Sequence, residues 1–155
     1  FAGCVHSVKS TSGLWVDVTG DGHSFPLFWQ SKKQSSVARS TTESELIAMA
    51  NGLFGEVYNL QAFLQALLGT VVHIQFYQDN TAQTASAKGW VLGTTSHTGR
   101  VHKVNVASVS EALEDETISA DHCTTLEQKA NGFTKIIPPI EWTMTLQQLS
   151  LNYKS

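Results

Sequence analysis

The chain has 155 residues, of which 41% are hydrophobic and 15% are charged, and its formal net charge is −3. This composition excludes a disordered or collagen-like chain, and the charge excludes a protein that binds nucleic acid through an overall positive field. A chain of this length buries about 70% of its unfolded surface, so its core needs no disulfide or metal. No apolar run approaches the roughly 20 residues of a membrane span. The two cysteines, Cys4 and Cys123, suit a reduced intracellular compartment, cytoplasmic or nuclear.

The first third of the chain is predicted to form a β-hairpin. Residues 13–19 and 25–30 both carry apolar side chains at every second position, the period of a strand with one buried face. Between them, Asp21-Gly22 is a favoured two-residue hairpin turn. Because Pro26 cannot donate a hydrogen bond to a neighbouring strand, we expect it at a sheet edge or a bulge.

A long helix is predicted to follow. Ser40-Thr-Thr-Glu43 matches a capping box and sets the helix start near residue 41, with Gly69 as its end. Apolar residues recur between these limits at steps of three and four, the spacing of one helix face: Leu46, Met49, Leu53, Val57, Leu60, Leu64 and Leu67.

The remaining elements alternate between strand and helix. In chain order the patterns predict a strand at 71–77, a helical turn at 81–88, a loop at 89–99, a helix at 104–113, a strand at 117–123, a helical region at 126–135 and, after Pro138-Pro139, a last helix at 145–151. This order predicts a mixed α/β (α+β) fold. We expect one domain over residues 1–137 and a C-terminal extension with a short helix over residues 138–155.

Five ordered sequence blocks resemble one known family. Residues 30–48 read Gln-Ser-Lys-Lys-Gln-Ser-Ser-Val-Ala-Arg-Ser-Thr-Thr-Glu-Ser-Glu-Leu-Ile-Ala. This block resembles the ribonuclease H domain that closes the Pol polyprotein of copia-type retrotransposons. The other blocks follow in the family's order: Phe1-Ala-Gly-Cys4, Ser10-Thr-Ser-Gly13, Tyr77-Gln-Asp-Asn80 and Gln128-Lys-Ala-Asn-Gly-Phe-Thr-Lys135.

The resemblance implies a fold, an activity and partners. The fold would be ribonuclease H-like, a mixed five-stranded sheet flanked by helices, with the first strand truncated in this chain. The activity would be that of a hydrolase, an endonuclease that cuts the RNA strand of an RNA–DNA hybrid with two Mg²⁺ ions, or with Mn²⁺ instead. The implied partners are the hybrid and the upstream reverse transcriptase region of the same polyprotein, with no membrane.

The resemblance also implies the site residues. Glu45 and Asp79 match two of the family's four metal-binding carboxylates. The fourth falls at Asn131, where the family has Asp, and the first would lie just before Phe1. From their local sequence alone, Glu45 could instead complement the helix dipole and Asp79 could end a strand. With two of four carboxylates present, we expect impaired catalysis, and Glu127, four residues before Asn131, is a candidate substitute ligand.

A basic patch precedes the long helix. Lys32, Lys33 and Arg39, with Arg100 further on, are predicted to bind the phosphates of nucleic acid, and the alternative is a solvated loop. If catalysis is lost, the alternative functions are a non-catalytic module that binds nucleic acid and a structural remnant of the domain.

Overall fold

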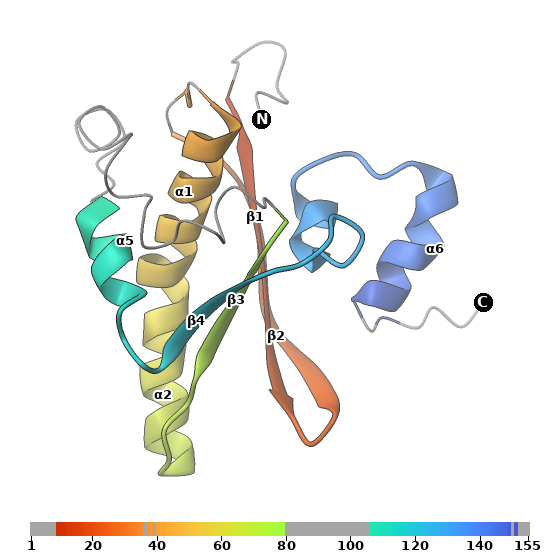
Figure 1. The fold of residues 1–155 in the computed structure, drawn as a ribbon. Coiled ribbons are helices and arrows are strands. Elements are labelled where there is room, and N and C mark those ends of the chain that lie inside the picture. The colour runs from red at the N-terminus through yellow and green to blue at the C-terminus, as the bar shows by residue number, and fades with distance from the viewer. Residues whose placement is uncertain (1–8, 36, 39, 80–105, 150, 152–155) are drawn as a thin grey trace.

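The computed structural model describes residues 9–35, 37–38, 40–79, 106–149 and 151, which form a mixed α+β fold. A long hairpin and a pair of short parallel strands lie beside one long helix, and a short helical segment lies on the other side of the hairpin (Figure 1). The predictions at 81–88 and 89–99 lie outside the described residues. No helix in the described ranges has the length and apolarity needed to cross a membrane.

The predicted hairpin is confirmed. Strands β1 (Thr11–Gly20) and β2 (His23–Lys33) pair antiparallel across a turn at Asp21 and Gly22, both with positive φ. The pairing register shifts between Val16 and Asp17, and the shift sets Asp17 opposite Pro26. This irregularity is the bulge that Pro26 predicts, because proline has no N–H for the ladder.

The predicted long helix is also confirmed, with an irregular centre. It consists of α1 (Thr41–Gly52), a π-helical turn η1 (Leu53–Val57) and α2 (Tyr58–Leu68). The Ser40 hydroxyl accepts a hydrogen bond from the backbone N–H of Glu43, as the capping box requires. Gly69 ends the helix with a left-handed backbone.

The second sheet is parallel. Strands β3 (Ile74–Gln78) and β4 (Ile118–His122) pair in register, with Ile74 opposite Ile118 and Gln78 opposite His122. Helix α5 (Val106–Ala112) lies between them in the chain. Within the described residues the four strands form two two-stranded sheets, β1-β2 and β3-β4, whereas the resemblance implies one five-stranded sheet.

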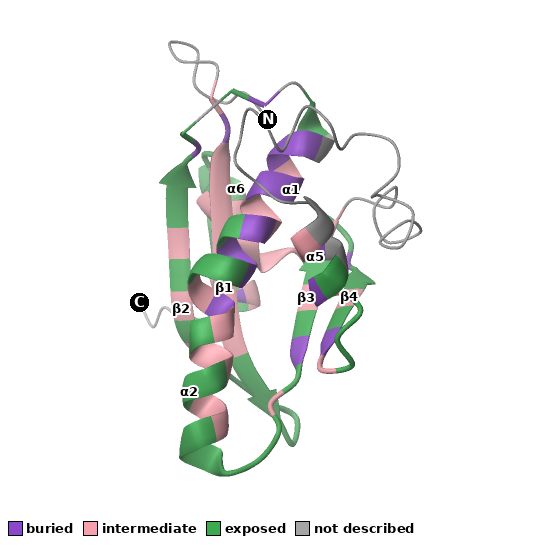
Figure 2. Cartoon of the chain, turned by 90° about the vertical axis from the view of Figure 1, so that its left-hand side faces the viewer, coloured by how far each residue is buried: buried purple, intermediate pink, exposed green. Residues whose placement is uncertain are grey.

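The core lies on one side of the long helix. Leu53 is fully buried and Val57 nearly so, and they pack with Ile74 of β3 and Ile118 of β4. Val16 of β1 packs against the same cluster. Burial is concentrated on α1 and η1, whereas α2 has no buried residue (Figure 2). Both sheets therefore pack against the centre of the helix, around η1.

The C-terminal elements differ from their predictions. The helical region at 126–135 is a 3-10 helix, η3 (Lys129–Phe133), and the last helix is α6 (Pro139–Gln148) rather than residues 145–151. Pro139 is in the first turn of α6, where its fixed φ and missing N–H cost the helix nothing. Pro138-Pro139 therefore starts this helix instead of delaying it. The predicted domain boundary at residue 137 lies between η3 and α6 and stays a prediction.

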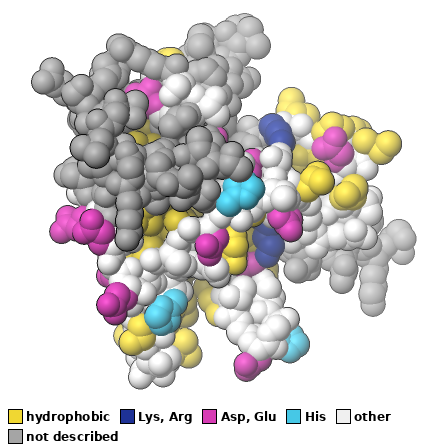
Figure 3. Space-filling view, in the orientation of Figure 1, with side chains coloured by type: hydrophobic (Ala, Val, Ile, Leu, Met, Phe, Trp, Pro, Cys, Tyr) yellow, Lys and Arg dark blue, Asp and Glu magenta, His cyan; other side chains and the backbone are white. Residues whose placement is uncertain are grey.

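Helix α6 contacts η3 and has no buried residue. Gly132 of η3 lies close to Thr145 of α6. A Cβ added at Gly132 would be 3.3 Å from the methyl carbon of Thr145. Exposed apolar side chains gather over α6 and the segment before it (Figure 3), among them Ile136, Ile140 and Met144.

Candidate metal and nucleic-acid site

The carboxyl ends of β3 and β4 lie side by side because the strands are parallel and in register. Asp79 directly follows β3 and Cys123 directly follows β4. The backbone N–H of Cys123 donates to the carbonyl oxygen of Gln78 at 2.8 Å, which extends the ladder by one step. Asp79 therefore stands at the edge where both strands end, as its predicted role requires.

Negative charge is concentrated at this edge. Burial raises the pKa of the Cys123 thiol, and the charges of Asp79 and Glu127 raise it further. Both carboxylates therefore lie within electrostatic range of the buried Cys123 thiol.

Helix α1 passes the same edge. The Gln78 amide Nε2 lies 3.0 Å from the Met49 sulfur, so the residue before Asp79 contacts the helix directly. Glu45 is four residues before Met49 and thus one turn earlier on the same helix face. The half-buried Glu45 side chain is carried by the helix that meets the end of β3.

Asn131 is a member of η3, and its side chain already has a partner. Its amide Nδ2 donates to the carbonyl oxygen of Thr125 at 2.8 Å. The Gln128 amide Nε2 donates to the carbonyl oxygen of Tyr77, which ties the segment before η3 to the end of β3. This contact brings η3 and its Asn131 to the same region of the fold as Asp79.

Glu127, the candidate substitute ligand, caps a turn. Its carboxylate accepts from the Thr124 backbone N–H at 3.0 Å and from the Thr124 hydroxyl at 2.8 Å. These two hydrogen bonds lower the pKa of Glu127. Within the described ranges, no group of three or more His, Cys, Asp or Glu side chains is arranged to hold a metal ion.

The predicted basic patch is described only in part. Lys32 and Lys33 are exposed at the end of β2, and Arg39 and Arg100 lie outside the described residues. The chain then turns back to α1 through Gln34, which is 5% exposed. The Gln34 amide Nε2 donates to Ser44 of α1 and to Ser12 of β1, which fixes the end of β2 against the helix.

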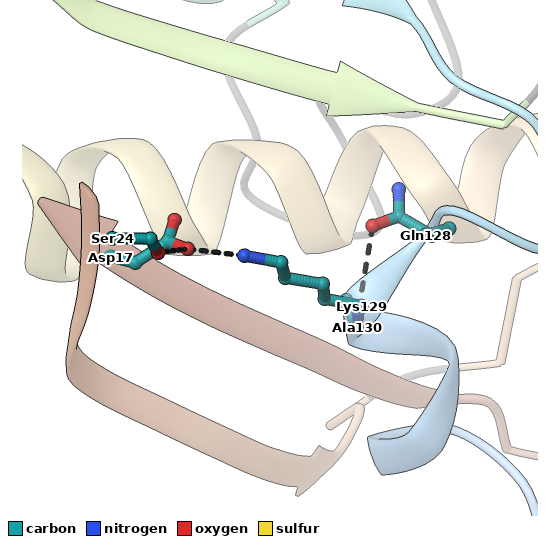
Figure 4. Close-up of polar contacts among 5 residues, drawn as sticks. All are labelled: Asp17, Ser24, Gln128, Lys129 and Ala130. Carbon is teal, nitrogen blue, oxygen red and sulfur yellow. Dashed lines mark hydrogen bonds and ion pairs between the residues drawn. The ribbon is translucent and has the colours of Figure 1, made fainter. Parts of the chain in front are cut away.

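An ion pair that the sequence did not predict joins η3 to the hairpin. Lys129 of η3 donates to the Asp17 carboxylate of β1, and the Ser24 hydroxyl donates to the same oxygen at 2.7 Å (Figure 4). Burial alone would raise the pKa of Asp17, but the Lys129 and Ser24 hydrogen bonds and the Lys129 charge hold it below its ordinary value. The sequence offered only Asp17 in a strand and Lys129 in a helical region, 112 residues apart.

Comparison with known proteins gives one relationship that bears on this site. Over 138 residues, 88% of this chain, the sequence is 31% identical to the Retrovirus-related Pol polyprotein from transposon TNT 1-94 of Nicotiana tabacum. The chain is a distant homologue of part of a copia-type Pol polyprotein. It spans only 10% of that relative's length. No family model and no solved structure matches the chain.

Proposed function

We propose that this chain is the ribonuclease H unit of a retrotransposon Pol polyprotein and hydrolyses the RNA strand of an RNA–DNA hybrid. The observation that carries the proposal is the contact between Gln78 and Met49. It joins the strand that ends at Asp79 to the helix that carries Glu45, the two residues that match the family's metal-binding carboxylates. The relationship to a Pol polyprotein supports the same assignment.

The donor set fits Mg²⁺. This ion prefers oxygen ligands and is commonly held by one or two carboxylates together with waters and substrate phosphates. Glu45 would supply one carboxylate from helix α1, and Asp79 would supply the other from the position directly after β3. When bound, two such ions stabilise both the attacking and the leaving oxygen of the phosphodiester. A complete two-ion site would need further acidic ligands, and the resemblance puts the first of them just before Phe1.

A single ribonuclease H-like sheet would also explain why the two sheets share one core. Val16 of β1 and Phe76 of β3 both pack against the cluster around Leu53. Yet among the described strands β1 pairs only with β2, and β3 only with β4. We propose that a fifth strand, the truncated first strand that the resemblance implies, pairs with both β1 and β3.

A cleavage assay on a labelled RNA–DNA hybrid tests the activity, in Mg²⁺ and again in Mn²⁺. Three proteins are compared: the chain as it stands, a repaired version with Asp-Ala-Asp before Phe1 and Asn131→Asp, and the repaired version with Asp79→Asn. We expect cleavage by the repaired version only. Asp79→Asn removes one charge from the metal site and should abolish cleavage.

Asp21→Asn in the repaired version is the matched control. It makes the same chemical change at the hairpin turn, where Asp21 is exposed and Asn tolerates the positive φ. This control should cut normally. Cleavage by the unrepaired chain would show that Asn131 and the missing aspartate do not matter, and a repaired version that never cuts would contradict the enzyme assignment.

One observation favours a second candidate function, a non-catalytic module that binds nucleic acid. Asn131 supplies a neutral amide where the family has a carboxylate, and its Nδ2 donates to the Thr125 carbonyl oxygen, so this position adds no negative charge for a metal ion. Binding of the hybrid that needs no divalent ion and weakens steeply with salt, without cleavage by the repaired version, would support this alternative.

A further inference from the structure

Three aromatic rings form a row across the hairpin face that carries η3. The Trp15 ring lies 5.8 Å from Phe133 of η3 and 6.1 Å from Trp29, with interplanar angles of 24° and 26°. Trp15 and Trp29 are directly opposite in the strand pairing. The row therefore starts under η3 and ends at Trp29 on β2.

Trp29 is open to solvent although its neighbours in the row are not. It is 58% exposed, whereas Trp15 and Phe133 are both partly buried. Packing within the described fold partly buries the Trp15 and Phe133 rings, but most of the Trp29 surface contacts no other side chain of the fold. Most of the Trp29 ring surface can therefore contact a ligand.

Positive charge lies along the same strand. Side chains alternate between the two faces of a strand, so Trp29, Ser31 and Lys33 share one face of β2. Lys33 is about 13 Å from Trp29 along the strand, and Lys32 is exposed beside it. An exposed ring followed by cations matches the chemistry that binds single-stranded nucleic acid, in which bases stack on aromatic side chains and the backbone follows positive charge.

We propose that β2 binds single-stranded nucleic acid, with one base stacked on Trp29 and a following phosphate near Lys33. The inference rests on the proposed function for its choice of a nucleic acid as the ligand. It adds a stacking residue on β2 to the carboxylates that follow β3 and β4, and it requires neither a metal ion nor cleavage.

The test is the fluorescence anisotropy of a labelled 12-nucleotide oligothymidylate, titrated with the full chain in EDTA at several salt concentrations. Trp29→Ala should weaken binding by roughly 5- to 150-fold, the range for one lost base stack. Trp29→Phe keeps an aromatic ring and should retain most of the affinity, which separates stacking from misfolding. Lys33→Gln should reduce the slope of log affinity against log salt by about 0.7, the value for one phosphate contact.

Trp142→Ala provides the matched control. Trp142 of α6 is 51% exposed but follows Glu141 rather than preceding lysines, so its loss should leave binding unchanged. Equal affinities for the unaltered chain and Trp29→Ala, or equal losses in Trp29→Ala and Trp142→Ala, would overturn the inference. Displacement of the oligonucleotide by polyglutamate as efficiently as by unlabelled oligonucleotide would also overturn it, in favour of an acidic peptide ligand.

This test is independent of the cleavage assay. If the repaired chain cuts hybrid while Trp29→Ala binds the oligonucleotide normally, the inference fails and the proposed function stands. If the oligonucleotide binds through Trp29 while no version cuts, the inference stands and the enzyme assignment fails.

Discussion

Two residues determine how η3 meets the hairpin. Gly13 of β1 lies so close to η3 that a Cβ would be 2.5 Å from the Ala130 carbonyl oxygen, so no side chain fits there. Opposite Gly13 in the pairing, the Ser31 hydroxyl donates to the Phe133 carbonyl oxygen. A missing side chain on one strand and a hydroxyl on the other let the backbone of η3 lie directly on the sheet.

The Asp17–Lys129 ion pair should make this contact depend on pH. The pKa of Asp17 is lower in the folded protein than the ordinary value of 3.8. A lowered folded-state pKa adds stability that is complete above the unfolded-state pKa and is lost as the pH falls through the folded-state value. At pH 7, Asp17→Asn should lower the free energy of unfolding by up to about 1 kcal/mol, the range for a partly exposed ion pair.

Urea unfolding at pH 7 and at pH 3 measures this effect. The difference between the unaltered chain and Asp17→Asn should shrink at pH 3, because the Asp17 carboxyl of the unfolded chain is then mostly protonated and folding must release that proton. Lys129→Gln removes the same pair from the other side and should cost a similar amount at pH 7. A difference for Asp17→Asn that is equally large at both pH values would contradict a role for the charge.

At the scale of elements, the long helix carries one apolar stripe but buries only part of it. Leu53 is fully buried where both sheets meet the helix, whereas Leu67 near the end of α2 is 66% exposed. Both leucines belong to the same apolar series at steps of three and four, so the sequence predicts the same burial for each. The difference arises because the packing partners of the helix contact α1 and its centre: α5 packs on α1, and β1, β3 and β4 pack around Leu53 and Val57.

Leu53→Ala should therefore lower the free energy of unfolding by about 2–5 kcal/mol, the usual cost of a cavity at a buried leucine. Leu67→Ala is the matched control in the same helix and should cost under about 0.5 kcal/mol. Thermal or urea unfolding compares the two. Equal losses would mean that α2 is buried in solution by a surface that the described residues do not include.

Local sequence patterns predicted elements better than their junctions. The hairpin, the capped start of the helix at Ser40 and the strands that precede Asp79 and Cys123 follow from turn chemistry, capping and periodicity. The π-helical turn at Leu53–Val57 and the start of α6 at Pro139 were missed. A one-residue irregularity leaves the apolar spacing almost unchanged, and a proline pair fits either a break or a first turn.

For the candidate site, the sequence predicted where residues lie within their elements but not which contacts they make. The sequence correctly placed Glu45 early in the helix and Asp79 at a strand end, and their roles as ligands stay predictions. No sequence pattern indicated that Gln78 contacts Met49 or that Asn131 donates to Thr125. These contacts depend on how separate elements pack, and neither contact has a local signature.

At the scale of the whole molecule, the described strands form two separate two-stranded sheets, which the proposed fifth strand would join. If the proposed fifth strand includes Phe1, then Asp-Ala-Asp added before Phe1 should lengthen it and add backbone hydrogen bonds to β1 and β3. We expect a higher melting temperature, by a few degrees for each kcal/mol gained.

Differential scanning calorimetry measures this shift. Gly-Ser-Gly added at the same place is the control for length alone, because its low strand propensity should add little. An unchanged melting temperature for the Asp-Ala-Asp version would contradict the placement of Phe1 in that strand.

The contacts of η3 with the hairpin also affect how the chain is made. Ser31 is bonded to Phe133, 102 residues further on, and Asp17 to Lys129, 112 residues further on. A nascent chain leaves the ribosome from its N-terminus, so the hairpin emerges long before the residues that cover one of its faces. Until η3 emerges, Trp15 has no Phe133 to pack against, and that face of the hairpin stays open to other nascent chains. The hairpin face that η3 covers therefore becomes buried only after the last fifth of this chain has emerged.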